Sequence, residues 1–307
     1  MANGKFAMAN LYSHKDSNIR KTWFLMTVFL VLVVFVGWAF GYVYNAPEIL
    51  YIAVILAVSM NFLAYWKSDA IALAMSGAKP ASRETHLELF RIIENLSITA
   101  GLPMPRVYIM HSPQINAFAT GRDPKHAAVA VTEGALMKLN KNELEGVIAH
   151  ELSHIGNRDI LISTVVVVLA GLIAILADWF LRMSIWGNLS RNDNNRQGGV
   201  VILLIGLAIA VLAPLIATVI RLAVSRKREF LADASGVLLT RYPEGLAGAL
   251  EKISQDQSPM RYAHSGTAHL FISNPFRGKS GQNWFARLFQ THPPIEERIK
   301  ALRDMHT

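Results

Sequence analysis

The sequence predicts a mainly α-helical membrane protein with four transmembrane helices and a small α+β unit outside the bilayer. Of the 307 residues, 52% are hydrophobic and only 17% are charged, whereas soluble domains average about 25% charged residues. Four apolar segments are long enough to cross a bilayer. The polar stretches between and after them show both helical and strand patterns, which predicts the additional α+β unit.

The four apolar segments are residues 23–44, 49–66, 160–181 and 200–224. A transmembrane helix needs roughly 20 mainly apolar residues. The first segment carries no charge and has tryptophan and tyrosine near its ends, which is typical of membrane interfaces. It is also too long for a cleavable signal peptide. The alternative for any one segment is a buried core helix, and it is strongest for the short second segment.

Lysine and arginine residues predict the orientation, because they favour the cytoplasmic side of a membrane. They precede the first segment and follow the second and fourth, and none occurs in the connection 45–48. We therefore expect both termini and residues 67–159 in the cytoplasm. The loop 182–199 should lie outside although it carries three arginines, so a shallow hairpin of the third and fourth segments is an alternative to two full spans.

The chain thus divides into a tail with a transmembrane hairpin (1–66), a first polar part (67–159), a second transmembrane hairpin (160–224) and a second polar part (225–307). In the first polar part, "RVYIM", "NAFAT" and "AAVAVT" are typical of short strands. A helix should then begin near Asn140 or Asn142, since each has a glutamate three residues later, as in a capping box. The second polar part is mostly helical in pattern.

Two classes of site or partner are excluded by composition. The chain has no cysteine, so disulfides, thiolate metal sites and cysteine nucleophiles are impossible. The formal charge of +8 forms no long basic run, and we therefore expect no nucleic-acid partner. Basic residues next to membrane spans account for the charge better.

The motif "HELSH" places Glu151 between His150 and His154. On a helix, positions i and i+4 lie on one face, so both imidazoles can reach one metal ion. Glu151 lies about 100° round the helix from His150, close enough to act as a general base without binding the metal. Because the pattern also arises by chance, the alternative is a helix end with exposed polar residues, and a third ligand is needed to decide.

A candidate third ligand lies in "SRKREFLADASG". Glu229 would complete the three protein ligands usual for a catalytic zinc ion, one ion per chain, and Asp233, one turn on, would accept the free N–H of a ligand histidine. In isolation this pair is more typical of a solvated helical face. However, His154 lies six residues before the third apolar segment and Glu229 five after the fourth, so a hairpin would bring them together at the membrane surface.

His292 stands in "THPPIEERI", where two prolines restrain the chain after it. A histidine held in this way could hydrogen-bond a developing oxyanion in a catalytic site. The same residues would equally suit a helix-capping segment held by prolines. The sequence leaves both interpretations open.

The "HELSH" helix, "NAFATG" before it, "EFLAD" after it, and the closing "LFISNPF" and "THPPIEERI" together resemble the HtpX-type membrane zinc metalloproteases, which are bacterial relatives of the CAAX prenyl endopeptidases. The likeness covers essentially the whole chain. It implies that the α+β unit is a zincin-like (gluzincin) catalytic domain. It also implies that His150, His154 and Glu229 bind one zinc ion and that Glu151 is the catalytic base.

The resemblance further implies a substrate-aligning edge strand, and an extended peptide would add to it by main-chain hydrogen bonds. The strand residues are Asn116, Ala117, Phe118 and Ala119. Family members act in stress response and protein quality control, cleaving misfolded or damaged membrane proteins on the cytoplasmic side of the inner membrane. We therefore expect a multi-pass inner-membrane protein in contact with lipid, with polypeptide substrates that are themselves membrane proteins.

The sequence leaves two alternatives open. One is a prenyl-protein endopeptidase that trims a C-terminal tail, although the short polar parts argue against a large enclosed chamber. The other is a non-catalytic scaffold or transporter with a vestigial metal site. A transporter should show polar residues deep within its spans or repeated halves, and apart from Asn61 and Pro214 the apolar segments show few such features.

Overall fold

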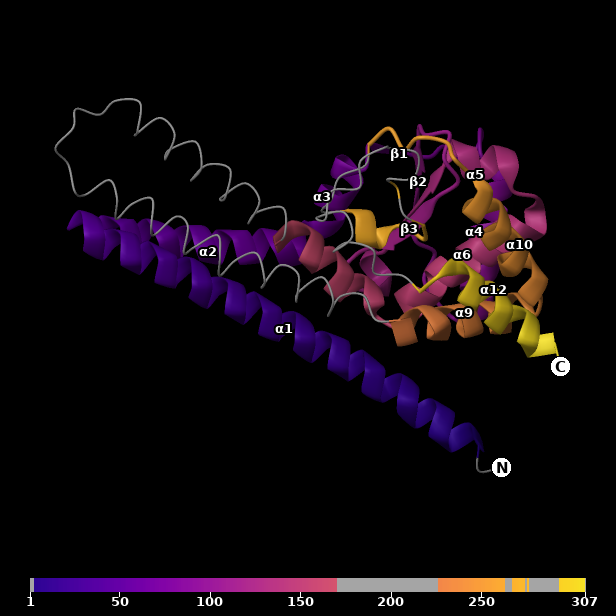
Figure 1. Ribbon diagram of the computed structural model, residues 1–307, viewed down its shortest axis with the longest axis horizontal. Helices are drawn as coiled ribbons and strands as arrows, with labels where there is room; N and C mark the ends of the chain where they lie inside the picture. Colours follow the sequence, from indigo (N-terminus) through magenta and orange to yellow (C-terminus); the bar gives the residue numbers. More distant parts are fainter. Residues whose placement is uncertain (1–2, 170–225, 263–266, 274, 276–292, 307) are drawn as a thin grey trace.

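The structure is a computed structural model that describes residues 3–169, 226–262, 267–273, 275 and 293–306 (Figure 1). The third apolar segment is therefore described only as far as residue 169. The fourth segment and the loop 182–199 lie outside the described residues. What is described is mainly helical and includes one small sheet.

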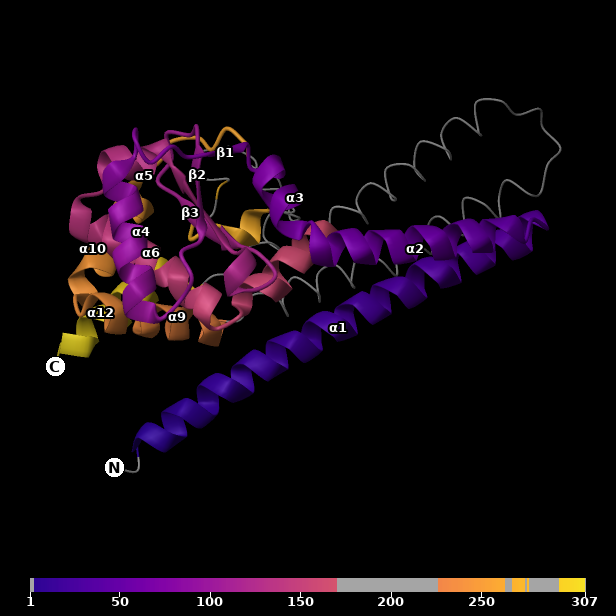
Figure 2. The same cartoon turned by 180° about the vertical axis from the view of Figure 1, so that it is seen from behind.

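The N-terminal part is a hairpin of two helices, α1 (Asn3–Tyr44) and α2 (Glu48–Trp66), which meet at the end of the molecule far from the sheet (Figures 1 and 2). Their stretches Ser17–Tyr42 and Glu48–Trp66 are long and apolar enough to cross a membrane. Both coincide with the first two predicted segments, although α1 begins well before residue 23. Large apolar side chains such as Phe35 and Ile55 are exposed on them, which suits contact with lipid.

A further helix, Asp159–Leu169, follows α6 (Lys141–Gly156) with a bend of 85°. Within the described residues, two helices qualify as membrane spans, or three if this bent pair counts as one span. The helix Asp159–Leu169 packs against the hairpin in one apolar cluster that includes Met26 and Phe29 of α1 and Ala57 of α2. The beginning of the third predicted segment thus lies against the first two.

The sheet contains β1 (Ala78–Pro80), β2 (Arg106–Met110), β3 (Ala117–Thr120) and β4 (Ala128–Thr132) in the order β1-β2-β4-β3. Strands β2 and β4 are parallel, and the other two pairs are antiparallel. Consequently β3 is an edge strand of the sheet. The strands predicted at 106–110, 116–120 and 127–132 agree to within one residue, whereas β1 and the helix α3 (Ser68–Met75) have no counterpart among the predicted elements.

Helix α6 lies at the centre of the helices beside the sheet. It begins at the predicted capping box: the Asn140 side chain accepts from the Glu143 N–H, and the Glu143 side chain accepts from the Asn140 N–H. Its apolar face joins one core with the sheet and its neighbours, through fully buried residues such as Leu152. The surrounding helices are α4 (Leu87–Ala100), α5 (Glu133–Lys138), α9 (Arg226–Thr240), α10 (Pro243–Gln255) and α12 (Ile295–Arg303), with short 3₁₀ turns at Pro124–His126, Ala268–Leu270 and Asp304–His306.

Glycines allow the neighbouring helices to approach α6 closely. A Cβ atom on Gly146 would lie 2.5 Å from the backbone nitrogen of Leu246 in α10. A Cβ atom on Gly236 of α9 would lie 3.1 Å from the backbone nitrogen of His150. The second approach brings α9, which carries Glu229 and Asp233, against the turn of α6 that carries the first motif histidine.

Candidate metal centre and active site

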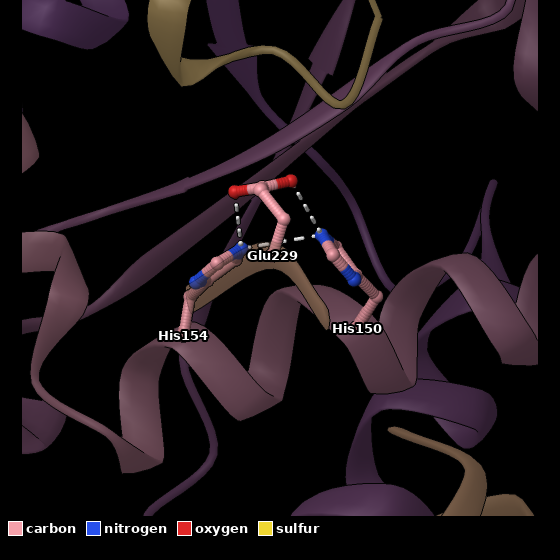
Figure 3. Close-up of side chains that lie close together, drawn as sticks. All are labelled: His150, His154 and Glu229. Carbon is pink, nitrogen blue, oxygen red and sulfur yellow. Dashed lines mark hydrogen bonds and ion pairs between the residues drawn. The ribbon is translucent and has the colours of Figure 1, made fainter. Parts of the chain in front are cut away.

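Two histidines and a glutamate converge between α6 and α9 (Figure 3). His150 and His154 lie on one face of α6, with their Nε2 atoms 3.2 Å apart. The Glu229 carboxylate places Oε2 3.8 Å from His150 Nε2 and Oε1 3.5 Å from His154 Nε2. One ligand atom from each residue lies within 4.8 Å of the others, so the three predicted ligands are adjacent in space.

The donor set fits a zinc ion. Bonds of about 2.0–2.2 Å in a tetrahedral site imply donor atoms about 3.3–3.6 Å apart, and the three distances of 3.2, 3.5 and 3.8 Å straddle that range. His150 is 1% exposed and Glu229 5% exposed. Two imidazoles, that of His150 buried and that of His154 half-buried, with one carboxylate are also a ligand combination that hydrolytic zinc sites use.

Each histidine is held by a carboxylate on its other ring nitrogen. His150 Nδ1 lies 2.9 Å from Asp233 Oδ1, and His154 Nδ1 lies 3.0 Å from Asp159 Oδ2. An Nδ1–H that donates to a carboxylate leaves the Nε2 lone pair free for a metal. Asp233 was predicted in this position, but Asp159 was not. The available signal was a carboxylate next to an apolar segment, where a charged group is costly unless it has a partner.

Two buried arginines complete the surroundings. Arg298 of α12, which is fully buried, donates to both oxygens of Asp233 at 2.9 and 2.7 Å, and its Nη1 lies 3.7 Å from Glu229 Oε2. Arg228 Nη1 lies 3.7 Å from Asp159 Oδ1. The site thus holds four carboxylates against two guanidinium groups, and this excess of carboxylates is what a divalent cation would balance. The carboxylates are Glu151, Asp159, Glu229 and Asp233.

The negative character of the site is reflected in its pKa values. Burial lowers the pKa of His154, but the hydrogen bond to Asp159 and the charge of Glu229 outweigh burial and raise it to about 9. Burial raises the pKa of Asp233, but Arg298 and the hydrogen bond with His150 outweigh burial and lower it to about 2. The field that favours a proton on His154 would equally favour a metal cation.

Glu151 stands beside the ligands and faces the sheet edge. It is 2% exposed, and its carboxylate accepts a hydrogen bond from the backbone N–H of Ala119 in β3. Burial raises the pKa of Glu151 and nearby Glu229 adds to this, although the two histidines and the Ala119 N–H act in the opposite direction. A carboxylate with a raised pKa holds a proton more strongly, which suits a general base.

The outer edge of β3 is partly occupied by the chain itself. The Ala117 carbonyl oxygen accepts from the Ile272 N–H at 3.1 Å. The Asn116 side chain accepts from the Ser273 N–H at 3.3 Å and donates to the Ser273 carbonyl at 3.1 Å. Two of the four residues expected to align a peptide therefore hold the segment 272–273, and Ala119 is the one that reaches the candidate base.

The other two predictions for this region have different outcomes. Phe118 is fully buried, and its ring packs edge-on against Phe271 with centroids 5.2 Å apart. It therefore serves the core next to the site. His292 lies outside the described residues, and its predicted contact with an oxyanion stays a prediction.

Comparison with known proteins shows extended similarity. Residues 83–306 match the model of peptidase family M48. A protease HtpX homolog from Caldanaerobacter subterraneus subsp. tengcongensis is 49% identical over 299 residues, which is 96% of this chain and 98% of that protein. A protease HtpX homolog from Pyrococcus furiosus is 50% identical over 265 residues, which is 86% of this chain and 89% of that protein.

A solved structure, the crystal structure of S. mikatae Ste24p, aligns with a TM-score of 0.49 and 18% identity over 96% of this chain and 67% of that chain. The family assignment depends on the sequence matches, which cover most of both partners. The chain therefore belongs to peptidase family M48 and is a membrane-associated metalloprotease.

Proposed function

We propose that the protein is a zinc-dependent endopeptidase that hydrolyses peptide bonds of misfolded or damaged membrane proteins. One zinc ion per chain would be held by His150, His154 and Glu229. The observation that carries this proposal is the convergence of these three donors in a buried, carboxylate-rich cluster, with Glu151 beside them. When bound, zinc supplies Lewis-acid chemistry by polarising a carbonyl oxygen and by lowering the pKa of a water molecule to about 7.

The proton transfers belong to Glu151. Its carboxylate takes a proton from the attacking water and passes it to the nitrogen of the leaving amine as the peptide bond breaks. Burial and the neighbouring charges raise its proton affinity, and its contact with the Ala119 N–H places it next to the sheet edge. The base therefore stands between the metal ligands and the strand that would carry the substrate.

The outer edge of β3 would position the peptide. An extended peptide adds to an exposed edge by main-chain hydrogen bonds, which recognise any sequence. Ile272 already takes the Ala117 carbonyl and Glu151 takes the Ala119 N–H, so we place the pairing at the carbonyl oxygen of Ala119, beside Glu151. This arrangement suits a protease that acts on unfolded segments, since only an extended chain can form such a pairing.

The position of the site suggests where its substrates lie. Helix α6 carries the two histidines, and the helix that follows it, Asp159–Leu169, packs on the transmembrane hairpin. Along the chain, only a few residues separate His154 from Leu161, which packs in the apolar cluster with α1 and α2. We propose four spans in a bacterial inner membrane, with the site and both termini in the cytoplasm. The distribution of lysine and arginine supports this orientation.

The substitution Glu151→Gln tests the catalytic assignment. The protein would be purified in detergent without chelators and incubated with an unfolded membrane protein. We expect the variant to retain zinc and to lose about 10²–10⁴-fold in cleavage rate, which is the usual contribution of general acid–base catalysis. Glu145→Gln, on the same helix, is the matched control and should cleave normally. A Glu151→Gln protein that holds zinc and cleaves as fast as wild type would disprove the mechanism.

A further inference from the structure

The first membrane helix reaches the metal centre. Asn18, at the start of the apolar stretch of α1, donates from Nδ2 to Asp159 Oδ1 at 2.8 Å, across 141 residues of sequence. Both side chains are buried, with Asn18 3% exposed and Asp159 4% exposed. A hydrogen bond to a buried carboxylate is among the stronger kinds, because the acceptor is charged and shielded from water.

Asp159 connects α1 to a metal ligand. Its Oδ2 lies 3.0 Å from His154 Nδ1 and so holds that ring by the nitrogen that faces away from the ligand cluster. Its Oδ1 accepts from Asn18 and lies 3.7 Å from Arg228 Nη1. Oδ2 therefore orients the histidine ring, while Oδ1 is held by the Asn18 amide of α1. Without the hydrogen bond from Asn18, the Asp159 carboxylate can rotate, and the imidazole can rotate with it.

The placement of α1 does not depend on this one bond. Met26, Phe29 and Val33 of α1 pack against Leu161 and Val165 of the helix that begins at Asp159. The two helices are thus already aligned by apolar contact over several turns. Asn18 lies two turns before Met26 on α1, at the end of the contact nearest the metal ligands. A polar group at that position is costly in an apolar interface unless it is hydrogen-bonded.

We propose that Asn18 is a positioning residue of the metal centre and that α1 is therefore part of the site rather than only an anchor. Asn18 fixes Asp159, and Asp159 fixes the tautomer and ring orientation of His154. This inference rests on the proposed function, since it requires His154 to be a zinc ligand. Its consequence is that tight zinc binding depends on the docking of the first membrane helix.

The test is zinc affinity in the full-length protein, purified in detergent and titrated against a competing chelator. Asn18→Leu keeps the side-chain size but removes the donor, and Asn18→Asp places a second carboxylate against Asp159. Partners of metal-binding histidines typically affect metal affinity by 10–100-fold. We expect about a tenfold loss for Asn18→Leu and a larger loss for Asn18→Asp. At saturating zinc, kcat should recover towards wild type while KM changes little.

The control is Thr22→Val, one turn further along α1. Thr22 is equally buried, and its hydroxyl donates to the Asn18 carbonyl oxygen within the same helix at 2.9 Å. This variant should bind zinc as wild type does. A merely structural role for Asn18 would lower the melting temperature of the zinc-loaded protein without changing its affinity for zinc, and that result would overturn the inference.

Failure of the inference and failure of the proposed function give different results. If His154→Ala and Glu229→Ala lose zinc but both Asn18 variants bind it as tightly as wild type, the inference is wrong and the proposed site stands. If His154→Ala binds zinc as tightly as wild type, the proposed site is wrong and the role of Asn18 falls with it.

Discussion

At the scale of single residues, the two histidines that we propose as zinc ligands are hydrogen-bonded by carboxylates with different partners. Asp233, which faces His150, accepts hydrogen bonds from Nε and Nη2 of the buried Arg298 guanidinium. Asp159, which faces His154, is held by the neutral amide of Asn18 at 2.8 Å and lies further, 3.7 Å, from Arg228. The contact of Asp233 is an ion pair with Arg298 of α12, whereas the main contact of Asp159 is a hydrogen bond from α1 of the membrane hairpin. Their loss should therefore have different consequences.

Replacing Asp233 by asparagine should destabilise the fold. The substitution removes the charged partner of Arg298 at 2.9 and 2.7 Å and leaves this fully buried guanidinium with Glu229 at 3.7 Å. Breaking a buried ion pair by removing one partner costs about 3–5 kcal/mol, and we expect a fall of that size in the free energy of unfolding, measured with denaturant in detergent. The control is Arg303→Leu, on α12 with Arg298. It removes exposed ion pairs with Glu244 and Glu251 and should change the free energy of unfolding by no more than about 1 kcal/mol. Equal effects would contradict this.

The sequence predicted the grouping of the candidate ligands because they follow a local rule. His150 and His154, and likewise Glu229 and Asp233, are four residues apart, and helical periodicity then places each pair on one face. Asn18 and Asp159 follow no such rule, since 141 residues separate them and their contact arises from tertiary packing. Arg298 lies in "THPPIEERI", where its spacing from other residues predicts no partner. Its pairing with Asp233 requires α12 to dock on α9, which no periodicity reveals.

At the scale of elements, α6 positions the site because its neighbours fix it on several sides. Its capping box sets where it starts, and α4, α9 and α10 join it in one core. Gly146 permits the closest of these approaches, with the backbone of α10. The direction of the motif histidines therefore depends on backbone contacts as well as on side-chain packing.

Gly146→Ala should destabilise the protein although alanine is the better helix former. The added Cβ atom would lie 2.5 Å from the Leu246 backbone nitrogen, so α10 must move. Overpacking of this kind costs about 1–3 kcal/mol, which exceeds the gain in helix propensity of about 1 kcal/mol. In Gly156→Ala, on the same helix, the nearest atom is 3.8 Å away, so stability should be unchanged or higher. Denaturant unfolding of both variants compares them, and a stabilised Gly146→Ala would refute the argument.

The end of α10 should lose stability in acid. Burial raises the pKa of Asp256, but hydrogen bonds from the Ile115 N–H, Ser258 and Lys138 outweigh it and lower the pKa to about 2. Because this value is below the ordinary 3.8, folding favours the ionised form. Its contribution is complete above the ordinary pKa and is lost as the pH falls from 3.8 towards about 2. The difference in melting temperature between wild type and Asp256→Asn should shrink over that range, and a constant difference would contradict the assignment.

Each element that the sequence did not predict escaped detection for a physical reason of its own. Helix α3 follows α2 after the single residue Lys67, so its apolar residues merge with the preceding span. Strand β1 has three residues and ends at Pro80, too short for alternation to be visible. Helix α1 extends towards the N-terminus beyond its apolar stretch. The residues there are more polar, so a search for apolar segments does not include them.

At the scale of the whole molecule, the membrane hairpin and the catalytic body are one structure. The connected end of the hairpin lies far from the sheet (Figures 1 and 2), yet α1 packs on the helix that follows α6 and donates a hydrogen bond to it through Asn18. A site built in this way cannot move far from the bilayer surface. That constraint supports our proposal that the substrates lie at the membrane.

The orientation can be tested by labelling, because the chain contains no cysteine of its own. Glu48→Cys marks the exposed turn between α1 and α2, and Lys125→Cys marks the exposed 3₁₀ turn before β4. We expect a membrane-impermeant maleimide to label Glu48→Cys in intact cells and Lys125→Cys only after the membrane is opened. The reverse pattern would place the catalytic body outside the cytoplasm.

The central claim is that His150, His154 and Glu229 together hold one zinc ion. The most direct measurement is the zinc content per chain of protein purified in detergent without chelators. We predict one zinc ion per wild-type chain and almost none in His154→Ala or Glu229→Ala. His126→Ala, whose exposed ring contacts Asp123, should keep the full amount. A Glu229→Ala protein with as much zinc as wild type, or a wild-type protein without zinc, would contradict the account.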